Sequence, residues 1–319
     1  MQKFLTLAFL FFIVLLLIKK PSDLIDYHVI KATIHMIVAS NMLSLSFRAL
    51  DKYTYLVIFN TRINIADYPG SQKPYSWLYT HKSQYAFLLV LSVAFFSIYR
   101  KYFRNIFTYC VSQGILLVAL YFSDTYTSMA AVLFIFAGQF LTYWWKTRWY
   151  FKLGSLVLVP FSFWLVTKEL LNRINTNRNL LTLGSRTLIL ESFAQHIQNN
   201  PNGIGAAFGS ENYFVTDGFS TSNCHNIFMN HMFRFSIPVG TIYIAIIVAI
   251  ILYSFIKNFS FMTLGIWIAL LIPLSMDYAL LTAELPFTLF ILYCIFFKKT
   301  SNDQPKRLHL FNRTHAPRY

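Results

Sequence analysis

The most regular feature of the chain is a series of long apolar stretches separated by short polar connections. Four follow one another in the middle of the chain, and three more lie toward the C-terminus. The four are each close to the roughly 20 residues that a helix needs to cross a bilayer. The pattern therefore predicts membrane helices over 85–99, 106–122, 128–145 and 149–166, and then over 238–256, 261–276 and 286–297.

The N-terminal part of the chain is less regular. Phe4–Ile18 is an uninterrupted apolar run without a following small-residue cleavage site, so we expect an uncleaved first membrane helix. Val29–Phe47 contains basic and polar residues, and the pattern fits either a spanning or an interfacial helix. Residues 51–84 are polar and carry turn signals, which indicates an extracytoplasmic loop. The expected fold is all-α and polytopic, with about eight to nine membrane helices and one long extracytoplasmic loop that contains short helices.

The charges in the connections predict how the chain crosses the membrane. The connections after the first and third central stretches hold Lys and Arg, whereas the one between them holds Asp124. Basic connections are typical of the cytoplasmic side. We therefore expect N-terminal membrane helices within 1–166, a large extracytoplasmic loop at 167–237, three C-terminal helices within 238–297 and a basic cytoplasmic tail at 298–319.

Composition supports a membrane protein and argues against other classes. Of the 319 residues, 56% are hydrophobic and 12% are charged, whereas soluble domains carry about 25% charged residues. The net charge of +15 is explained by basic cytoplasmic loops, so we expect no nucleic-acid partner. The three cysteines and the acids of the long loop lack ligand spacing, so neither a disulfide framework nor a metal site is predicted.

The long polar segment Gly184–Gly240 is where a site is expected. Arg186 begins an amphipathic pattern that should end at Asn199–Gly203, because proline and glycine there favour turns. A cation at a helix N-terminus opposes the helix dipole. Arg186 can therefore have another use, binding a phosphate or diphosphate, or it can be a surface arginine that reaches toward the membrane interface.

His225 and Asn226 stand just before the helix that should return to the membrane. A neutral imidazole there can accept a proton from a sugar hydroxyl, as a general base does. The alternative is a helix cap, in which Asn223 or the His–Asn pair binds the first N–H groups of the helix. Along that helix we expect Phe228, Met232 and Phe235 to be buried.

Read together, four features resemble the O-antigen ligase and polymerase family. Two are in the long loop: the Asn-Pro-x-Gly-x-Gly segment at 200–205, which follows the Gly-Ser-Arg start, and the pair His225–Asn226. Upstream, His81 with Lys82 and Ser83 is similar to the family's His-Pro-Asn segment, and 123–128 is similar to its Ser-Arg-Thr segment without the arginine. The chain departs from the ligase pattern at Ser236, where that pattern has glycine, and Gly240 follows later.

The resemblance implies glycosyl transfer on the outer side of the bacterial cytoplasmic (inner) membrane. The donor would be an undecaprenyl-diphosphate-linked oligosaccharide, with no cofactor, nucleotide sugar or required metal. Arg186 would bind the diphosphate and His225 would be the base. Asn226, His81, Lys82 and Arg62 would contribute to substrate binding.

A polymerase, a ligase, a transporter and a purely structural membrane subunit are weighed on this basis, and the structural subunit would leave Arg186 and His225 unexplained. The displacement of the ligase pattern's glycine from position 236 to Gly240 favours a polymerase, which adds a lipid-linked chain to the next lipid-linked repeat unit of an O-antigen, capsule or exopolysaccharide. A ligase that moves the finished glycan to a terminal acceptor is the alternative within the family. A transporter or flippase of lipid-linked saccharide would need polar residues within its spans, and the apolar stretches offer few. Membrane lipid, a chain-length regulator and a flippase are the further partners that a polymerase implies.

Overall fold

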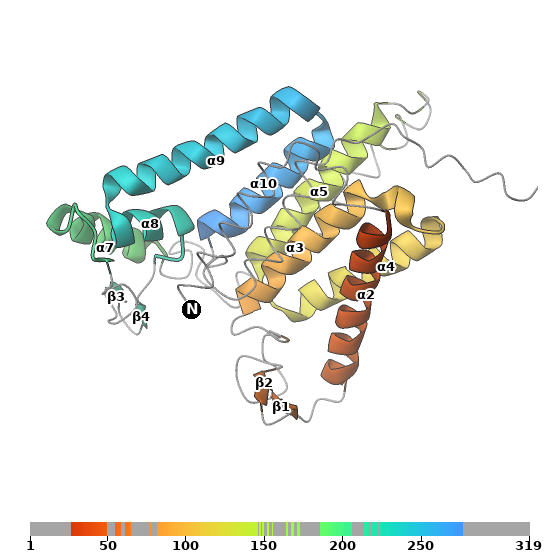
Figure 1. The fold of residues 1–319 in the computed structure, drawn as a ribbon, viewed down its shortest axis with the longest axis horizontal. Coiled ribbons are helices and arrows are strands. Elements are labelled where there is room, and N and C mark those ends of the chain that lie inside the picture. The colour runs from red at the N-terminus through yellow and green to blue at the C-terminus, as the bar shows by residue number, and fades with distance from the viewer. Residues whose placement is uncertain are drawn as a thin grey trace, which may run out of the picture.

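The computed structural model shows a mainly helical protein (Figure 1). Among the residues that the structure describes, three helices contain segments that are long and apolar enough to cross a membrane, namely His28–Phe47, Tyr126–Trp144 and Ile237–Ile256. The shorter apolar helices are Lys82–Ile98, Ile106–Phe122 and Phe261–Met276. The structure describes residues 27–49, 55–58, 61–64, 77, 82–145, 147, 149, 152, 155, 164, 167–168, 171–172, 186–205, 214–216, 219–221 and 224–276.

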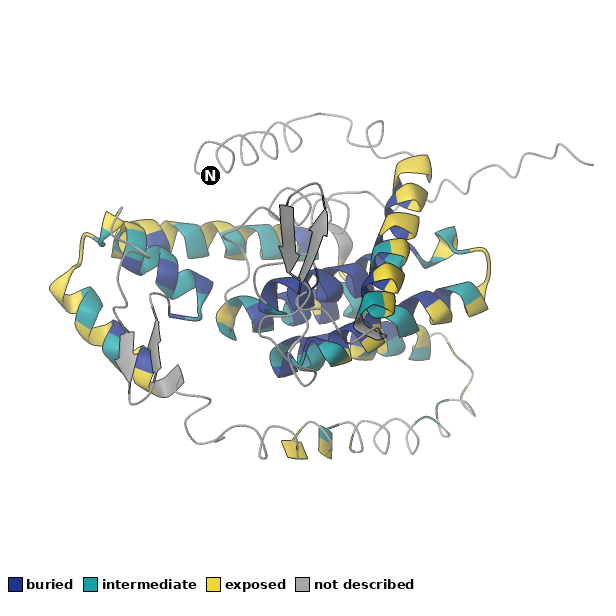
Figure 2. Ribbon diagram, turned by 90° about the horizontal axis from the view of Figure 1, so that it is seen from below, coloured by how far each residue is buried: buried dark blue, intermediate teal, exposed yellow. Residues whose placement is uncertain are grey.

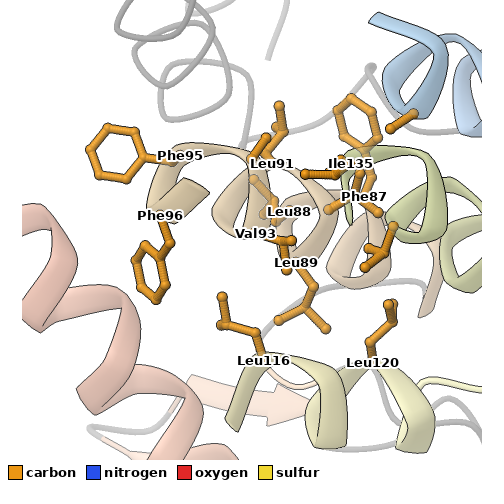
Figure 3. Packing of buried hydrophobic residues seen from close by; sticks show 14 of the residues in the cluster. Phe87, Leu88, Leu89, Leu91, Val93, Phe95, Phe96, Leu116, Leu120 and Ile135 are labelled. Carbon is orange, nitrogen blue, oxygen red and sulfur yellow. The ribbon is translucent and has the colours of Figure 1, made fainter. Parts of the chain in front are cut away.

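Helix α3 (Lys82–Ile98) forms the centre of the protein. Every residue from Ser83 to Ser97 is buried, as expected of a helix that is apolar on all sides. Its leucines and phenylalanines pack against Leu116 and Leu120 of α4 (Ile106–Phe122) and near Ile135 of α5 (Tyr126–Trp144) (Figure 3). The dark blue of α3 in Figure 2 shows this burial against the more exposed helices around it.

Helices α5 and α10 (Phe261–Met276) are closely packed and antiparallel. A Cβ added to Gly265 would lie only 3.1 Å from the Cα of Gly138. Farther along α5, the Thr142 hydroxyl accepts a hydrogen bond from the N–H of Met262 at 3.1 Å. Small residues at such a crossing let two helix backbones approach each other. Gly265 and Gly138 therefore fix how α5 and α10 are aligned.

Gly265→Ala should weaken this packing. The added Cβ would meet the carbonyl oxygen of Phe134 and the Cα of Gly138, and backbone atoms cannot move aside as a flexible side chain can. We expect a loss of about 1–3 kcal/mol in the free energy of unfolding, measured by denaturation of the purified protein. Gly114→Ala on α4 is the control, because a Cβ there meets nothing within 4 Å. Equal stability of the two variants would contradict the close crossing.

Further helices adjoin this core. Helix α2 (Tyr27–Ala49) is joined to α3 by the Tyr85 hydroxyl, which donates to Asn41 Oδ1 at 2.8 Å. A short 3-10 helix, η2 (Arg100–Tyr102), links α3 to α4. Helix α9 (Ile237–Asn258) reaches the core at its C-terminal half, where the Trp267 Nε1–H donates to Ser254 Oγ at 2.6 Å. Many of the other residues of α9 are apolar and exposed, as on a lipid-facing helix (Figure 2).

The described part of the long loop contains α7 (Arg186–Asn199) and α8 (Ile227–Phe235). In the connections, as far as the structure describes them, β1 (Tyr55–Ile58) pairs with β2 (Thr61–Asn64), and β3 (Phe214–Thr216) pairs with β4 (Phe219–Thr221), each pair antiparallel. The sequence pattern did not predict these hairpins. Each is only three or four residues per strand, which is too short for a clear alternation of apolar and polar positions.

Several predicted segments agree closely with the helices. The predictions for 106–122 and 261–276 match α4 and α10, and the amphipathic pattern from Arg186 matches α7. The weaker stretch Val29–Phe47 is helical and long enough to span. The predicted helices 4–18 and 286–297 and the tail 298–319 lie outside the described residues, and only isolated positions of 149–166 are described.

Candidate functional site

One end of the helix core gathers several of the predicted site segments. Ser275 follows Gly265 by ten residues on α10, and Ser128 precedes Gly138 by ten residues on the antiparallel α5. At about 1.5 Å per residue, both lie about 15 Å from the glycine crossing in the same direction. The start of α5 and the end of α10 therefore share one end of the core, where α8 also lies (Figure 1).

Lys82 is anchored at this same end. It is the first residue of α3, and its Nζ donates a hydrogen bond to the carbonyl oxygen of Asp124 at 3.3 Å. Asp124 lies between α4 and α5 with φ of +49°, in the left-handed region that non-glycine residues seldom adopt. Lys82 and the 123–128 segment, two upstream features of the family resemblance, are thus in direct contact.

Asn226 connects α8 to the same end of the core. Its Oδ1 accepts hydrogen bonds from the N–H groups of Phe228 at 3.0 Å and Met229 at 3.2 Å, so it is the N-cap of α8. Its Nδ2 donates to the carbonyl oxygen of Ser275 at 3.0 Å. The helix-cap interpretation of Asn226 is confirmed. Because these bonds occupy the amide, Asn226 serves chiefly to position the chain.

His225 is held in an unusual backbone conformation between two anchored neighbours. Its φ is +51°, and its side chain is half-buried. Asn226 is fixed by the cap, and the N–H of Cys224 donates to Asn230 Oδ1 at 2.8 Å. Left-handed non-glycine residues persist where the surrounding structure over-determines them, and they cluster at functional sites. His225 has such a left-handed conformation, fixed by its neighbours, and it lies at the same end of the core as Lys82.

The 200–204 turn clamps the junction between α8 and α9. The N–H of Ile204 donates to the carbonyl oxygen of Phe233 at 3.0 Å, and the N–H of Ile237 donates to that of Pro201 at 3.4 Å. Gly203 has φ of +77° and lies so close to residues 234–236 that a Cβ would be 2.8 Å from their backbone. The Asn-Pro-x-Gly segment is therefore packed directly beside the helix that begins after His225.

Helices α7 and α8 share a small apolar cluster. It consists of buried Ile189, Phe193, Cys224 and Phe233, and burial raises the pKa of the Cys224 thiol. Of the three α8 residues that were expected to be buried, Phe235 is exposed, whereas Phe228 and Met232 are half-buried and Met232 packs against this cluster. The fully buried positions are Ile227, Asn230 and Phe233, because α8 packs against α7. Phe235 is 46% exposed.

His231 belongs to the packing between α8 and α9. Its ring lies 4.1 Å from that of Tyr243 and is stacked at 5.8 Å on Phe235. Burial, with a smaller effect of the Arg234 charge, lowers the pKa of His231 to about 4. His231 is therefore neutral near pH 7, and its ring contacts indicate that it packs between α8 and α9 and does not act as a charged group.

The other predicted site residues are placed less completely. Arg186 is the first residue of α7, and Arg62 is in β2, where it pairs with Val57. Their side chains, and the whole of His81, lie outside the described residues. Sequence reasoning missed Asn230, although a lone amide on an otherwise apolar helix face was a usable signal. The backbone carbonyl of Ser275 gave no such signal, because every residue has a backbone carbonyl whatever its side chain.

Ser236 has a backbone conformation that favours glycine. Its φ is +133° and its ψ is 164°, and its Oγ accepts a long hydrogen bond of 3.4 Å from Val239. This region is essentially restricted to glycine and costs about 1–3 kcal/mol for other residues. Ser236 also occupies the place where the ligase pattern has glycine.

Ser236→Gly should therefore stabilise the protein. Relief of backbone strain should exceed the few tenths of a kcal/mol lost with the cap, which gives a gain of about 1 kcal/mol and a rise of roughly 2 °C in the unfolding midpoint. Ser236→Ala is the matched control, because it loses the cap and keeps the strain. A lower midpoint for Ser236→Gly than for Ser236→Ala would show that the backbone is not strained there.

Comparison of the chain with protein-family models, with curated proteins and with solved structures identified no match.

Proposed function

We propose that this chain is an integral membrane glycosyltransferase that polymerises undecaprenyl-diphosphate-linked oligosaccharide repeat units into a surface or exo-polysaccharide. The active site would be on the extracytoplasmic side of the bacterial cytoplasmic membrane. The observation that carries the proposal is the shared end of the core, where Lys82 binds the Asp124 turn and the His225–Asn226 pair is attached to Ser275.

The expected topology agrees with this arrangement. With the basic connections in the cytoplasm, the start of α3, the α4–α5 turn and the end of α10 all lie outside. At the opposite end of the core, the Arg100 guanidinium lies over the rings of Tyr109 and Tyr143 at 5.4 and 5.2 Å. Basic residues and aromatic rings are typical of a cytoplasmic membrane boundary.

The proposed reaction uses these groups in separate roles. The acceptor hydroxyl oxygen attacks the anomeric carbon, the bond from that carbon to the phosphate oxygen breaks, and undecaprenyl diphosphate leaves. His225 takes the hydroxyl proton as general base. Lys82 and Arg186 stabilise the negative charge of the diphosphate. This step needs no electron donor or acceptor, because it only exchanges one C–O bond for another.

A ligase is the second candidate, and the conformation of Ser236 favours it. The serine in place of the ligase pattern's glycine weighed toward a polymerase, yet Ser236 has the positive φ of +133° that glycine favours. A chain can thus keep the backbone of that pattern without the glycine. The choice between polymerase and ligase then depends on the acceptor.

An assay with defined acceptors separates these functions. Purified protein in nanodiscs is incubated with a synthetic undecaprenyl-diphosphate-linked repeat unit, and the products are sized on a gel. A ladder supports a polymerase, and a single product formed only when a separate lipid-saccharide acceptor is added supports a ligase. Movement of intact substrate across a proteoliposome membrane without a new glycosidic bond would contradict both and indicate a transporter.

A further inference from the structure

Asn230 is a buried amide in a mainly apolar setting. It is 2% exposed on α8 beside the cluster of Ile189, Phe193, Cys224 and Phe233. We propose that Asn230 is a positioning residue, which holds His225 in its left-handed conformation by binding the chain on both sides of it. The inference rests on the proposed function, in which His225 is the base.

The geometry explains how one residue can do this. The Asn230 side chain accepts a hydrogen bond from the N–H of Cys224 at 2.8 Å, and its own backbone N–H donates to the carbonyl oxygen of Asn226 at 2.9 Å. These two partners are the residues immediately before and after His225. The second bond is an ordinary helical one, whereas the first requires an acceptor on the side chain of residue 230.

The amide nitrogen of Asn230 indicates that the amide oxygen is the atom that determines the orientation of this side chain. Asn230 Nδ2 is buried and has no hydrogen-bond partner within the described part of the chain. Rotating the amide would place the NH2 group against the N–H of Cys224, so the observed orientation is fixed by that bond. An unpaired buried donor is unfavourable. A leucine of similar size would avoid this cost but could not bind Cys224.

Asn230 also completes the connection from His225 to the core. Asn226 is bonded to Ser275 of α10, and Asn230 binds the residues on either side of His225. The backbone of His225 is therefore fixed relative to the end of the core that holds Lys82. A displacement of about 1 Å in a catalytic group can cost on the order of 100-fold in rate, so loss of the Cys224 bond should affect turnover more than binding.

Two variants and one control test the proposal. Asn230→Leu removes the acceptor at similar volume, and Asn230→Asp keeps an oxygen in its place. Asn105→Ala is the control, because Asn105 Oδ1 accepts a 2.8 Å hydrogen bond from the N–H of Thr108 at the opposite end of the core. The first measurement is the rate at which diethylpyrocarbonate modifies His225, followed by mass spectrometry with His196 as internal reference. The second is kcat and KM in the polymerisation assay.

We expect Asn230→Leu to change the His225 modification rate at least threefold and to lower kcat about 30- to 100-fold, with KM within threefold. Asn230→Asp and Asn105→Ala should stay within twofold to threefold of the wild type in both measurements. An unchanged modification rate in Asn230→Leu would overturn the proposal. It would also be overturned if Asn230→Asp lost as much activity and changed the modification rate as much as a defective Asn230→Leu.

The two readouts separate this inference from the proposed function. If the wild type transfers no saccharide, the proposed function fails, while the modification rate still decides whether Asn230 holds His225. If Asn230→Leu does not fold, Asn230→Asp decides alone, since near-wild-type modification and kcat support the acceptor role and a large loss contradicts it.

Discussion

His225→Asn should reduce polysaccharide formation by about 100- to 10,000-fold, the usual contribution of a general base. Asparagine tolerates the left-handed region better than most residues, so this change removes the imidazole while allowing the φ of +51°. Both kcat and kcat/KM should fall, since proton transfer belongs to the transition state. The ladder assay with measured protein levels in the membrane checks this result.

His196→Asn is the matched control for that experiment. His196 lies on α7 in the same long loop and is half-buried, and its ring lies 6.0 Å from that of Phe233. We expect its activity to stay within threefold of the wild type. His225→Asn protein that is folded and retains more than a tenth of wild-type kcat would show that His225 is not the base. His225→Ala should lose the ladder as well, with near-normal protein levels.

Gly203→Ala should disrupt the junction between α8 and α9. Alanine at φ of +77° is strained, and its Cβ would lie 2.8 Å from the carbonyl oxygen of Arg234, the carbonyl carbon of Phe235 and the N of Ser236. These are backbone atoms, so relief requires the 200–204 turn to move away. We expect a loss of about 3–5 kcal/mol in the free energy of unfolding, together with loss of the ladder.

Gly205→Ala is the control for that experiment, because it separates the cost of backbone strain from the cost of a clash between the added Cβ and neighbouring atoms. Gly205 also has positive φ, at +56°, but a Cβ there meets nothing within 4 Å. It should cost about 1–2 kcal/mol, measured by the same denaturation. If Gly203→Ala costs no more than Gly205→Ala, the turn does not clamp the helix junction.

Helix positions could largely be predicted because they depend on local patterns. The apolar runs that become α4 and α10 are bounded by polar residues, and the Asn-Pro-x-Gly segment ends α7 where turn residues accumulate. The capping role of Asn226 was also one of the alternatives drawn from sequence, since asparagine before an apolar helix is a common N-cap.

Contacts between residues far apart in the sequence could not be predicted from these local patterns. The bond from Asn226 to the carbonyl of Ser275 spans 49 residues and uses a backbone group. The face of α8 was predicted wrongly because the helix was expected to enter the membrane directly. It instead ends at Phe235 and buries Phe233 against Phe193, with ring centres 6.4 Å apart. Such partners depend on tertiary packing, which periodicity along the chain does not specify.

Release of the lipid carrier tests the central claim most directly. Purified wild-type protein in nanodiscs is supplied with an undecaprenyl-diphosphate-linked repeat unit in the presence of EDTA, and free undecaprenyl diphosphate is counted against new glycosidic bonds. Transfer by the proposed reaction predicts one carrier released for each bond formed, and almost none from His225→Asn. Folded wild-type protein that releases no carrier, or an equal yield from His225→Asn, would contradict it.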